Sequence, residues 1–114
     1  CAAALLVQAD GAREHLVFDD IACMLDHRRT NPALPVLTAF VRDYSARDWI
    51  SADSAWYLQG RDGSPTTPMA SGIVAFASRA AADQQLALTP GRVLDAAAIA
   101  ESRVPPPEAA AEAR

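Results

Sequence analysis

Six side chains in this 114-residue sequence could bind a soft metal ion. Two are thiols, two are thioethers and two are imidazoles: Cys1, Cys23, Met24, Met69, His15 and His27. Thiolate, thioether and imidazole ligands together suit Cu(I) and, to a lesser degree, Zn(II). The elements that carry these side chains decide which of them can meet in one site.

The densest group of ligands lies in DIACMLDHRR, where Ile21, Met24 and Leu25 repeat at helical spacing. Cys23 and His27 are four residues apart and share one helix face, which makes them the best local pair of ligands. Met24 follows Cys23 directly, so on a helix the two side chains diverge by about 100°. The alternative is structural: a small buried cysteine and a surface histidine at the end of a helix.

Met69 has a different setting, in TTPMASG. A core methionine usually lies inside a periodic apolar segment, but Met69 follows Pro68 and precedes Ala70, Ser71 and Gly72. This pattern predicts a bent loop that presents the side chain. The alternative is that Met69 packs under its own loop. His15, by contrast, is expected to be a solvated residue of a strand.

Catalytic patterns are scarce in the sequence. Asp19 and Asp20 could serve as general acid and base, but consecutive aspartates at a helix start usually cap the helix and interact with its dipole. The sequence has no Gly-rich phosphate loop, no nucleophile elbow and no paired-cysteine zinc pattern. We therefore expect that the protein is not an enzyme.

The elements that must position the ligands follow the order strand, strand, helix, and this order occurs twice. The first unit spans about 2–30 and the second about 54–90, with Ser78 as the expected cap of the second helix. A strand is expected at 36–44, a connection at 45–54, and a last strand and helix at 92–103. The predicted fold is α+β, a single domain over 1–103 with two tandem ββα units, followed by a flexible tail at 104–114.

Composition and charge exclude some classes of partner. The net charge is −4 and no basic stripe is present, which argues against a nucleic acid. No apolar run approaches the roughly 18 residues of a membrane span. A first residue Cys1 is what cleavage of a bacterial lipoprotein signal leaves, so a lipid on Cys1 is the one expected membrane contact. A truncated chain would begin in the same way, and a Cys1–Cys23 disulfide would need an oxidising compartment.

Three segments in register resemble the NosL family of bacterial copper-chaperone lipoproteins. They are FDDIACML (Phe18–Leu25), VRDYSARDWISADSAWYL (Val41–Leu58) and TPMASGIVAFASRAAA (Thr67–Ala82). The resemblance implies two ββα units, similar in outline to part of organomercurial lyase. It also implies a protein of the periplasm or cell envelope that holds Cu(I). Such a protein passes the ion to a copper-receiving protein or transporter complex, for the assembly of nitrous oxide reductase.

The resemblance also implies part of a ligand set. Met69 matches the methionine of the family's PM-SG motif and is expected to supply a thioether. Many members carry a CGM motif before the first strand, which this sequence lacks. The remaining ligands would then come from Cys23, Met24 or His27, from Cys1, or from a partner.

Two other classes of function stay open beside copper delivery. One is a non-metal interaction module, in which the aromatic-rich middle of the chain docks a partner. The other is a thiol-dependent enzyme that cleaves a carbon–metal bond, with Cys23 as nucleophile and Asp19 or Asp20 as proton donor.

Overall fold

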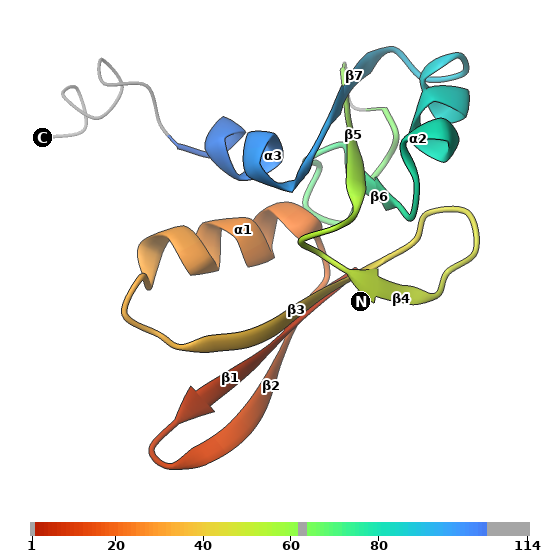
Figure 1. Ribbon diagram of the computed structural model, residues 1–114. Helices are drawn as coiled ribbons and strands as arrows, with labels where there is room; N and C mark the ends of the chain where they lie inside the picture. Colours follow the sequence, from red (N-terminus) through yellow and green to blue (C-terminus); the bar gives the residue numbers. More distant parts are fainter. Residues whose placement is uncertain (1, 62–63, 105–114) are drawn as a thin grey trace, which may run out of the picture.

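The computed structural model describes residues 2–61 and 64–104, and it contains the two expected ββα units (Figure 1). The first consists of β1 (Ala3–Ala9), β2 (Ala12–Phe18) and α1 (Ile21–Thr30), and the second of β5 (Trp56–Gly60), β6 (Ile73–Phe76) and α2 (Arg79–Leu86). Strands β3 (Val36–Arg42) and β4 (Trp49–Ser51) lie between the units, and β7 (Gly91–Leu94) and α3 (Ala96–Ser102) follow them. The predicted α+β fold is therefore confirmed.

The first unit belongs to a four-stranded antiparallel sheet in the order β2-β1-β3-β4, and α1 lies against one face of it (Figure 1). Ala3, Leu5 and Val7 alternate along β1 and are at most 1% exposed, as expected for the covered face of a strand. β1 and β2 join through Asp10 and Gly11, whose φ angles are 50° and 79°. Asp-Gly favours this left-handed pair, which matches the twist of the two strands.

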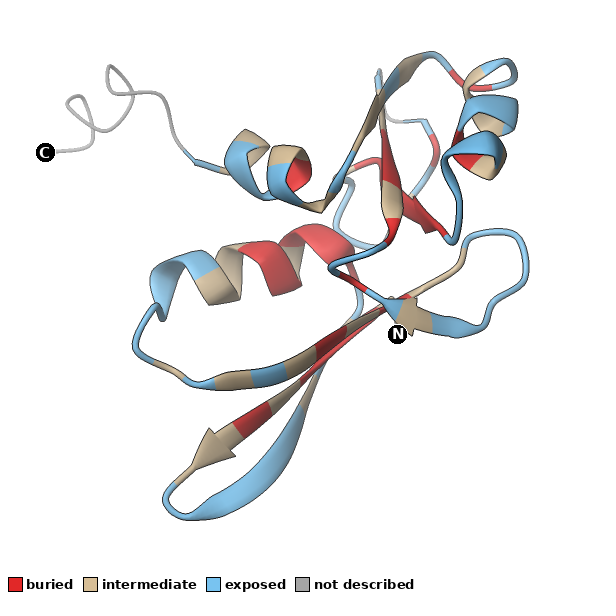
Figure 2. Cartoon of the chain, in the orientation of Figure 1, coloured by how far each residue is buried: buried red, intermediate tan, exposed pale blue. Residues whose placement is uncertain are grey.

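The second unit forms a three-stranded antiparallel sheet in the order β6-β5-β7. Successive residues of β5 point to opposite faces of the sheet and enter two different apolar clusters. Tyr57 packs in the main core together with Leu5 and Ile99 of α3, whereas Leu58 packs with Ala82 of α2. The second sheet is thus covered on both faces, and its inner face joins the core of the first unit, seen as the buried regions in Figure 2.

A backbone hydrogen bond ties the two sheets together, and each sheet holds one tryptophan beside a guanidinium. The Tyr44 N–H donates to the Ala75 carbonyl at 2.8 Å, so the chain after β3 runs along β6. In the first sheet, the Arg42 guanidinium lies 4.0 Å from the ring centre of Trp49. In the second, that of Arg79 on α2 lies 5.2 Å from the ring centre of Trp56. Both distances fit cation–π contacts.

The structure differs from the sequence prediction at a few boundaries. The expected connection at 45–54 contains the three-residue strand β4, and β3 ends at Arg42 because the next residues turn towards β6. Cys1 and residues 105–114 lie outside the described residues. Within the described part of the chain, no helix has the length and apolar character to cross a membrane.

Candidate metal centre

Met69 lies in the long connection between β5 and β6, and its side chain is 64% exposed. The connection closes on itself at Thr67, whose carbonyl accepts from the Ala70 N–H at 2.9 Å and whose hydroxyl accepts from the Gly72 N–H at 3.1 Å. Ala70 and Gly72 have φ angles of 60° and 70°. The tight backbone leaves Met69 pointing outward, so it does not pack under its own loop.

This loop is anchored to the start of α1 by Asp20. Asp20 is fully buried, and its Oδ1 accepts from the Ala22 N–H at 3.0 Å, which makes it the N-cap of α1. Its Oδ2 accepts from the Met69 N–H at 3.0 Å, and the Ser71 hydroxyl donates to Oδ1. A residue 49 positions earlier in the chain therefore holds the backbone of Met69.

The hydrogen bonds also set the charge of Asp20. Burial alone would raise the pKa of this carboxyl, but the hydroxyls of Ser71 and Thr67 and the N–H groups of Ala22 and Met69 together lower the pKa below its ordinary value of 3.8. The carboxylate is therefore ionised at neutral pH and is fully engaged as an acceptor. It cannot act as the proton donor of the enzyme hypothesis, and the capping interpretation of the sequence is confirmed.

Cys23 lies in the first turn of α1, beside this anchor. Its N–H donates to the Asp20 carbonyl at 3.1 Å, so Asp20 contacts both Cys23 and Met69. Burial raises the pKa of the Cys23 thiol, the charges of Asp20 and Asp26 raise it further, and Arg103 opposes them. The thiol is free and stays protonated at neutral pH, so a metal ion must displace its proton.

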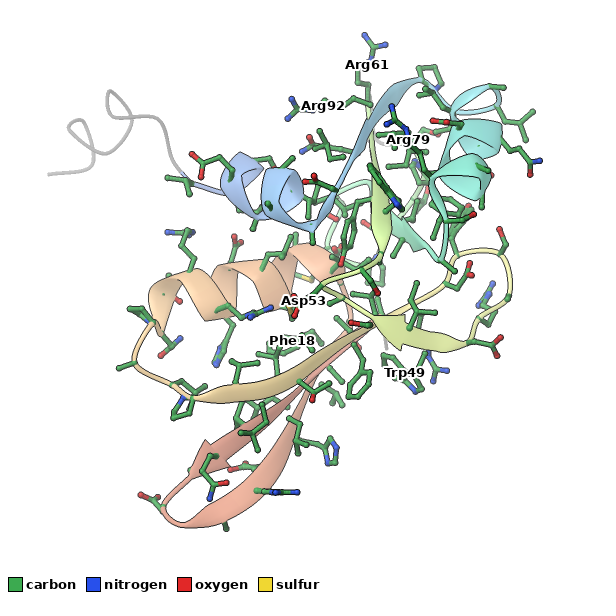
Figure 3. The ribbon with its side chains drawn as sticks, in the orientation of Figure 1. Phe18, Trp49, Asp53, Arg61, Arg79 and Arg92 are labelled. Atoms are coloured by element: carbon green, nitrogen blue, oxygen red, sulfur yellow. The ribbon has the colours of Figure 1, made fainter. Side chains whose placement is uncertain are left out.

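The other two predicted ligands of α1 lie in different surroundings. Met24 is fully buried in the main core, which agrees with its predicted divergence from Cys23 and removes it from any surface site. His27 is half-buried one turn after Cys23, about 6 Å further along the helix axis. Its ring centre lies 5.5 Å from that of Phe18 on β2, labelled beneath α1 in Figure 3. His15 is exposed, as predicted.

An open cleft of about 630 Å³ lies beside the Met69 loop. It is lined by the start of α1 with Asp19 and Asp20, by Arg42 and Arg47, and by the loop residues 66–68. The Arg42 guanidinium donates to the Arg47 carbonyl at 3.0 Å, which fixes one wall. The cleft thus carries both signs of charge beside the loop that bears Met69.

The sequence did not identify the loop anchors Asp20, Thr67 and Ser71. Their signal was weak: a capping aspartate needs one oxygen for the helix, and only the fold shows what the second oxygen binds. Among the described residues, no group of three or more histidine, cysteine, aspartate or glutamate side chains could hold a metal ion. The arrangement instead offers a thioether and a thiol.

Comparison with known proteins places the chain in a family. The NosL family model matches residues 2–104. The chain belongs to the NosL family. No curated protein matches it. Family membership supports the prediction that the chain is not an enzyme, and it confirms the resemblance found in the sequence.

Two solved NosL structures share the fold. The crystal structure of the copper chaperone NosL from Shewanella denitrificans is 18% identical, with a TM-score of 0.62 over 82% of this chain and 74% of that one. The solution structure of the apo-NosL protein from Achromobacter cycloclastes is 26% identical, with a TM-score of 0.60 over 83% of this chain and 82% of that one. The single domain with two antiparallel sheets is therefore a NosL fold.

Proposed function

We propose that this chain is an extracytoplasmic copper chaperone that binds Cu(I) at Met69 and delivers it to a receiving protein. The observation that carries the proposal is an exposed thioether whose backbone is held against the turn that bears the Cys23 thiol. Family membership and the similarity to the copper chaperone of S. denitrificans support the choice of cargo.

The ligand set follows from the chemistry of each side chain. Met69 offers a soft, neutral donor that needs no deprotonation, and soft donors select Cu(I). Cys23 is proposed as a second ligand and His27 as a third, further along the same helix. Met24 is omitted because it is fully buried. Cys1, outside the described residues, and ligands from the partner complete the list of proposed donors.

An exposed site with few ligands suits transfer rather than storage. A receiving protein can approach Met69 from solvent and replace the ligands one at a time, with the ion shared in between. We propose that this transfer takes place in the periplasm, with the chain anchored by a lipid on Cys1, and that a transporter complex or nitrous oxide reductase receives the copper.

The test is a Cu(I) titration against a chromophoric chelator under reducing conditions. We expect one-to-one binding that weakens at least about tenfold in Met69→Ala, because a ligand is lost, and that also weakens in Cys23→Ser. Binding through Cys23 should strengthen as the pH rises, because the thiol must lose its proton. Cys1→Ser and His27→Ala test the remaining donors in the same assay.

Met24→Leu is the matched control, because it removes the other thioether while nearly conserving volume in the core. It should leave the Cu(I) affinity unchanged. Equal affinity of Met69→Ala and the parent chain would contradict the proposed site. A melting temperature that Cu(I) does not raise would instead favour the non-metal interaction module, since a ligand of the folded state must stabilise it.

The structure gives the enzyme hypothesis no support. Thiol-assisted cleavage of a carbon–metal bond needs a thiolate and a proton donor. Here the pKa of Cys23 is raised by burial, and the pKa of Asp20 is lowered by its hydrogen bonds, which outweigh burial. Both shifts oppose the required protonation states.

A further inference from the structure

The N-caps of the three helices in the described part of the chain differ in what they bind. Ser78 and Asp95 are exposed, and each side chain accepts from one N–H of its own helix, α2 or α3. Asp20 is fully buried and also accepts from the Met69 N–H and the Ser71 hydroxyl. A cap needs one oxygen, so the second oxygen of Asp20 has a role outside α1.

Burying a carboxylate is costly unless its oxygens are hydrogen-bonded. Among the described residues, every hydrogen-bond partner of the Asp20 side chain beyond the helix comes from the loop that presents Met69. The two side-chain oxygens accept different hydrogen bonds: Oδ1 accepts from the Ala22 N–H and the Ser71 hydroxyl, and Oδ2 accepts from the Met69 N–H. The contact to Met69 can therefore be removed without removing the cap.

The contact acts on the direction of the Met69 side chain. A residue whose N–H is fixed, and whose successor Ala70 is held in the left-handed region at φ 60°, has little freedom at its Cα. The Cα–Cβ bond of Met69 is then aimed by the backbone while the thioether stays in solvent. Because the Asp20 carbonyl also binds the Cys23 N–H, one residue sets the placement of both proposed ligands.

We infer that Asp20 is the positioning residue of the metal site: its Oδ2 holds the Met69 backbone so that the thioether faces an ion beside the first turn of α1. Asp20 itself is not a ligand, because its oxygens are buried and occupied. This inference rests on the proposed function for the role of Met69, but the contact itself is measurable without metal.

The first arm of the test uses the metal-free protein. The sequence has two methionines, so selective 15N-methionine labelling gives two amide signals, one from Met69 and one from Met24 inside α1. In Asp20→Asn the amide oxygen can keep the cap, while its NH₂ group faces the Met69 N–H and cannot accept from it. We expect the Met69 amide proton to shift upfield and to exchange with solvent at least about tenfold faster, with the Met24 signal unchanged.

The second arm measures Cu(I) affinity by chelator competition. Asp20→Asn should lower the affinity about tenfold, a typical loss for a residue that orients a metal ligand without touching the ion. In a Met69→Ala background the same change should have no further effect. Asp95→Asn is the matched control, since it alters an exposed cap whose side chain accepts from the Ala98 N–H of its own helix α3, and it should change neither readout.

Three results would overturn the inference. One is a Met69 amide unaffected by Asp20→Asn, and another is an equal loss of Cu(I) affinity with and without Met69. If the variant does not fold, the parent protein decides, because rapid exchange of its Met69 amide would show that the anchor is absent. If Met69→Ala leaves Cu(I) binding intact, Met69 is not a ligand and the proposed function is contradicted. The Met69 amide signal of the metal-free protein still tests the hydrogen bond to Asp20 separately.

Discussion

The two ββα units differ most in the connection between their paired strands. In the first unit, Asp10 and Gly11 join β1 to β2 in a tight turn, and no other residue intervenes. In the second, β5 and β6 are separated by residues 61–72, which carry Met69 and reach back to Asp20. The same supersecondary unit thus serves as a scaffold in one half and carries the presented side chain in the other.

The two methionines give the largest expected difference between the units. Met24→Ala removes a fully buried side chain and should lower the free energy of unfolding by about 2–5 kcal/mol. Met69→Ala removes an exposed one and should cost less than about 0.5 kcal/mol. Urea denaturation of both variants measures the contrast, and a large loss in Met69→Ala would mean that the loop contributes to the core.

The glycines of the two connections give a smaller difference. A Cβ on Gly60, at the end of β5, would overlap the Ser64 carbonyl oxygen, so Gly60→Ala must displace the start of the loop and should cost about 1–3 kcal/mol. Gly11→Ala meets no atom within 4 Å but has φ 79°, and should cost about 1 kcal/mol.

The sharper readout for this glycine pair is the Met69 amide signal. It should move in Gly60→Ala and stay in place in Gly11→Ala, because only the first substitution disturbs the connection that carries Met69. A Met69 signal that responds equally to both substitutions would mean that the two hairpins are not structurally independent.

Acid stability should show the smallest effect, confined to low pH. The hydrogen bonds of Asp20, which outweigh its burial, lower its folded-state pKa. Its stabilising contribution is therefore present above the unfolded-state pKa, ordinarily 3.8, and is lost as the pH falls through the folded-state value. Asp20→Asn should flatten the fall in unfolding free energy measured by urea titration between neutral and acidic pH. Ser71→Ala removes one hydrogen-bond donor to Asp20 and should reduce the fall in unfolding free energy in part. If the unfolding free energy of Asp20→Asn fell as steeply with pH as that of the parent, the lowered folded-state pKa of Asp20 would be contradicted.

The sequence predicted the elements whose signals are local. The strand, strand, helix order of each unit and the helix caps, expected at Asp19 or Asp20 and at Ser78, each depend on residues within a few positions of one another, and they are present in the structure with Asp20 as the first cap. The strand β4 was missed because three residues carry too little periodicity to be recognised.

The candidate site was predicted only in part, because its decisive contact is long-range. The Pro and Gly neighbours of Met69 left both an exposed and a packed side chain open, and the structure has the exposed one; the helical face of Cys23 followed from spacing. No local pattern could show that Asp20 binds a residue 49 positions away. Met24 was included for its sulfur, although its spacing with Ile21 and Leu25 already placed it on the apolar face of α1.

The two guanidinium–indole contacts place one fluorescent tryptophan in each sheet. Trp49 belongs to β4 in the first sheet and Trp56 to β5 in the second, and the sequence has no other tryptophan. Figure 3 shows Trp49 near β4 and Arg79, the partner of Trp56, on α2. Each half therefore carries one tryptophan in contact with one guanidinium, and in a variant that keeps only one of the two tryptophans the emission reports on a single half.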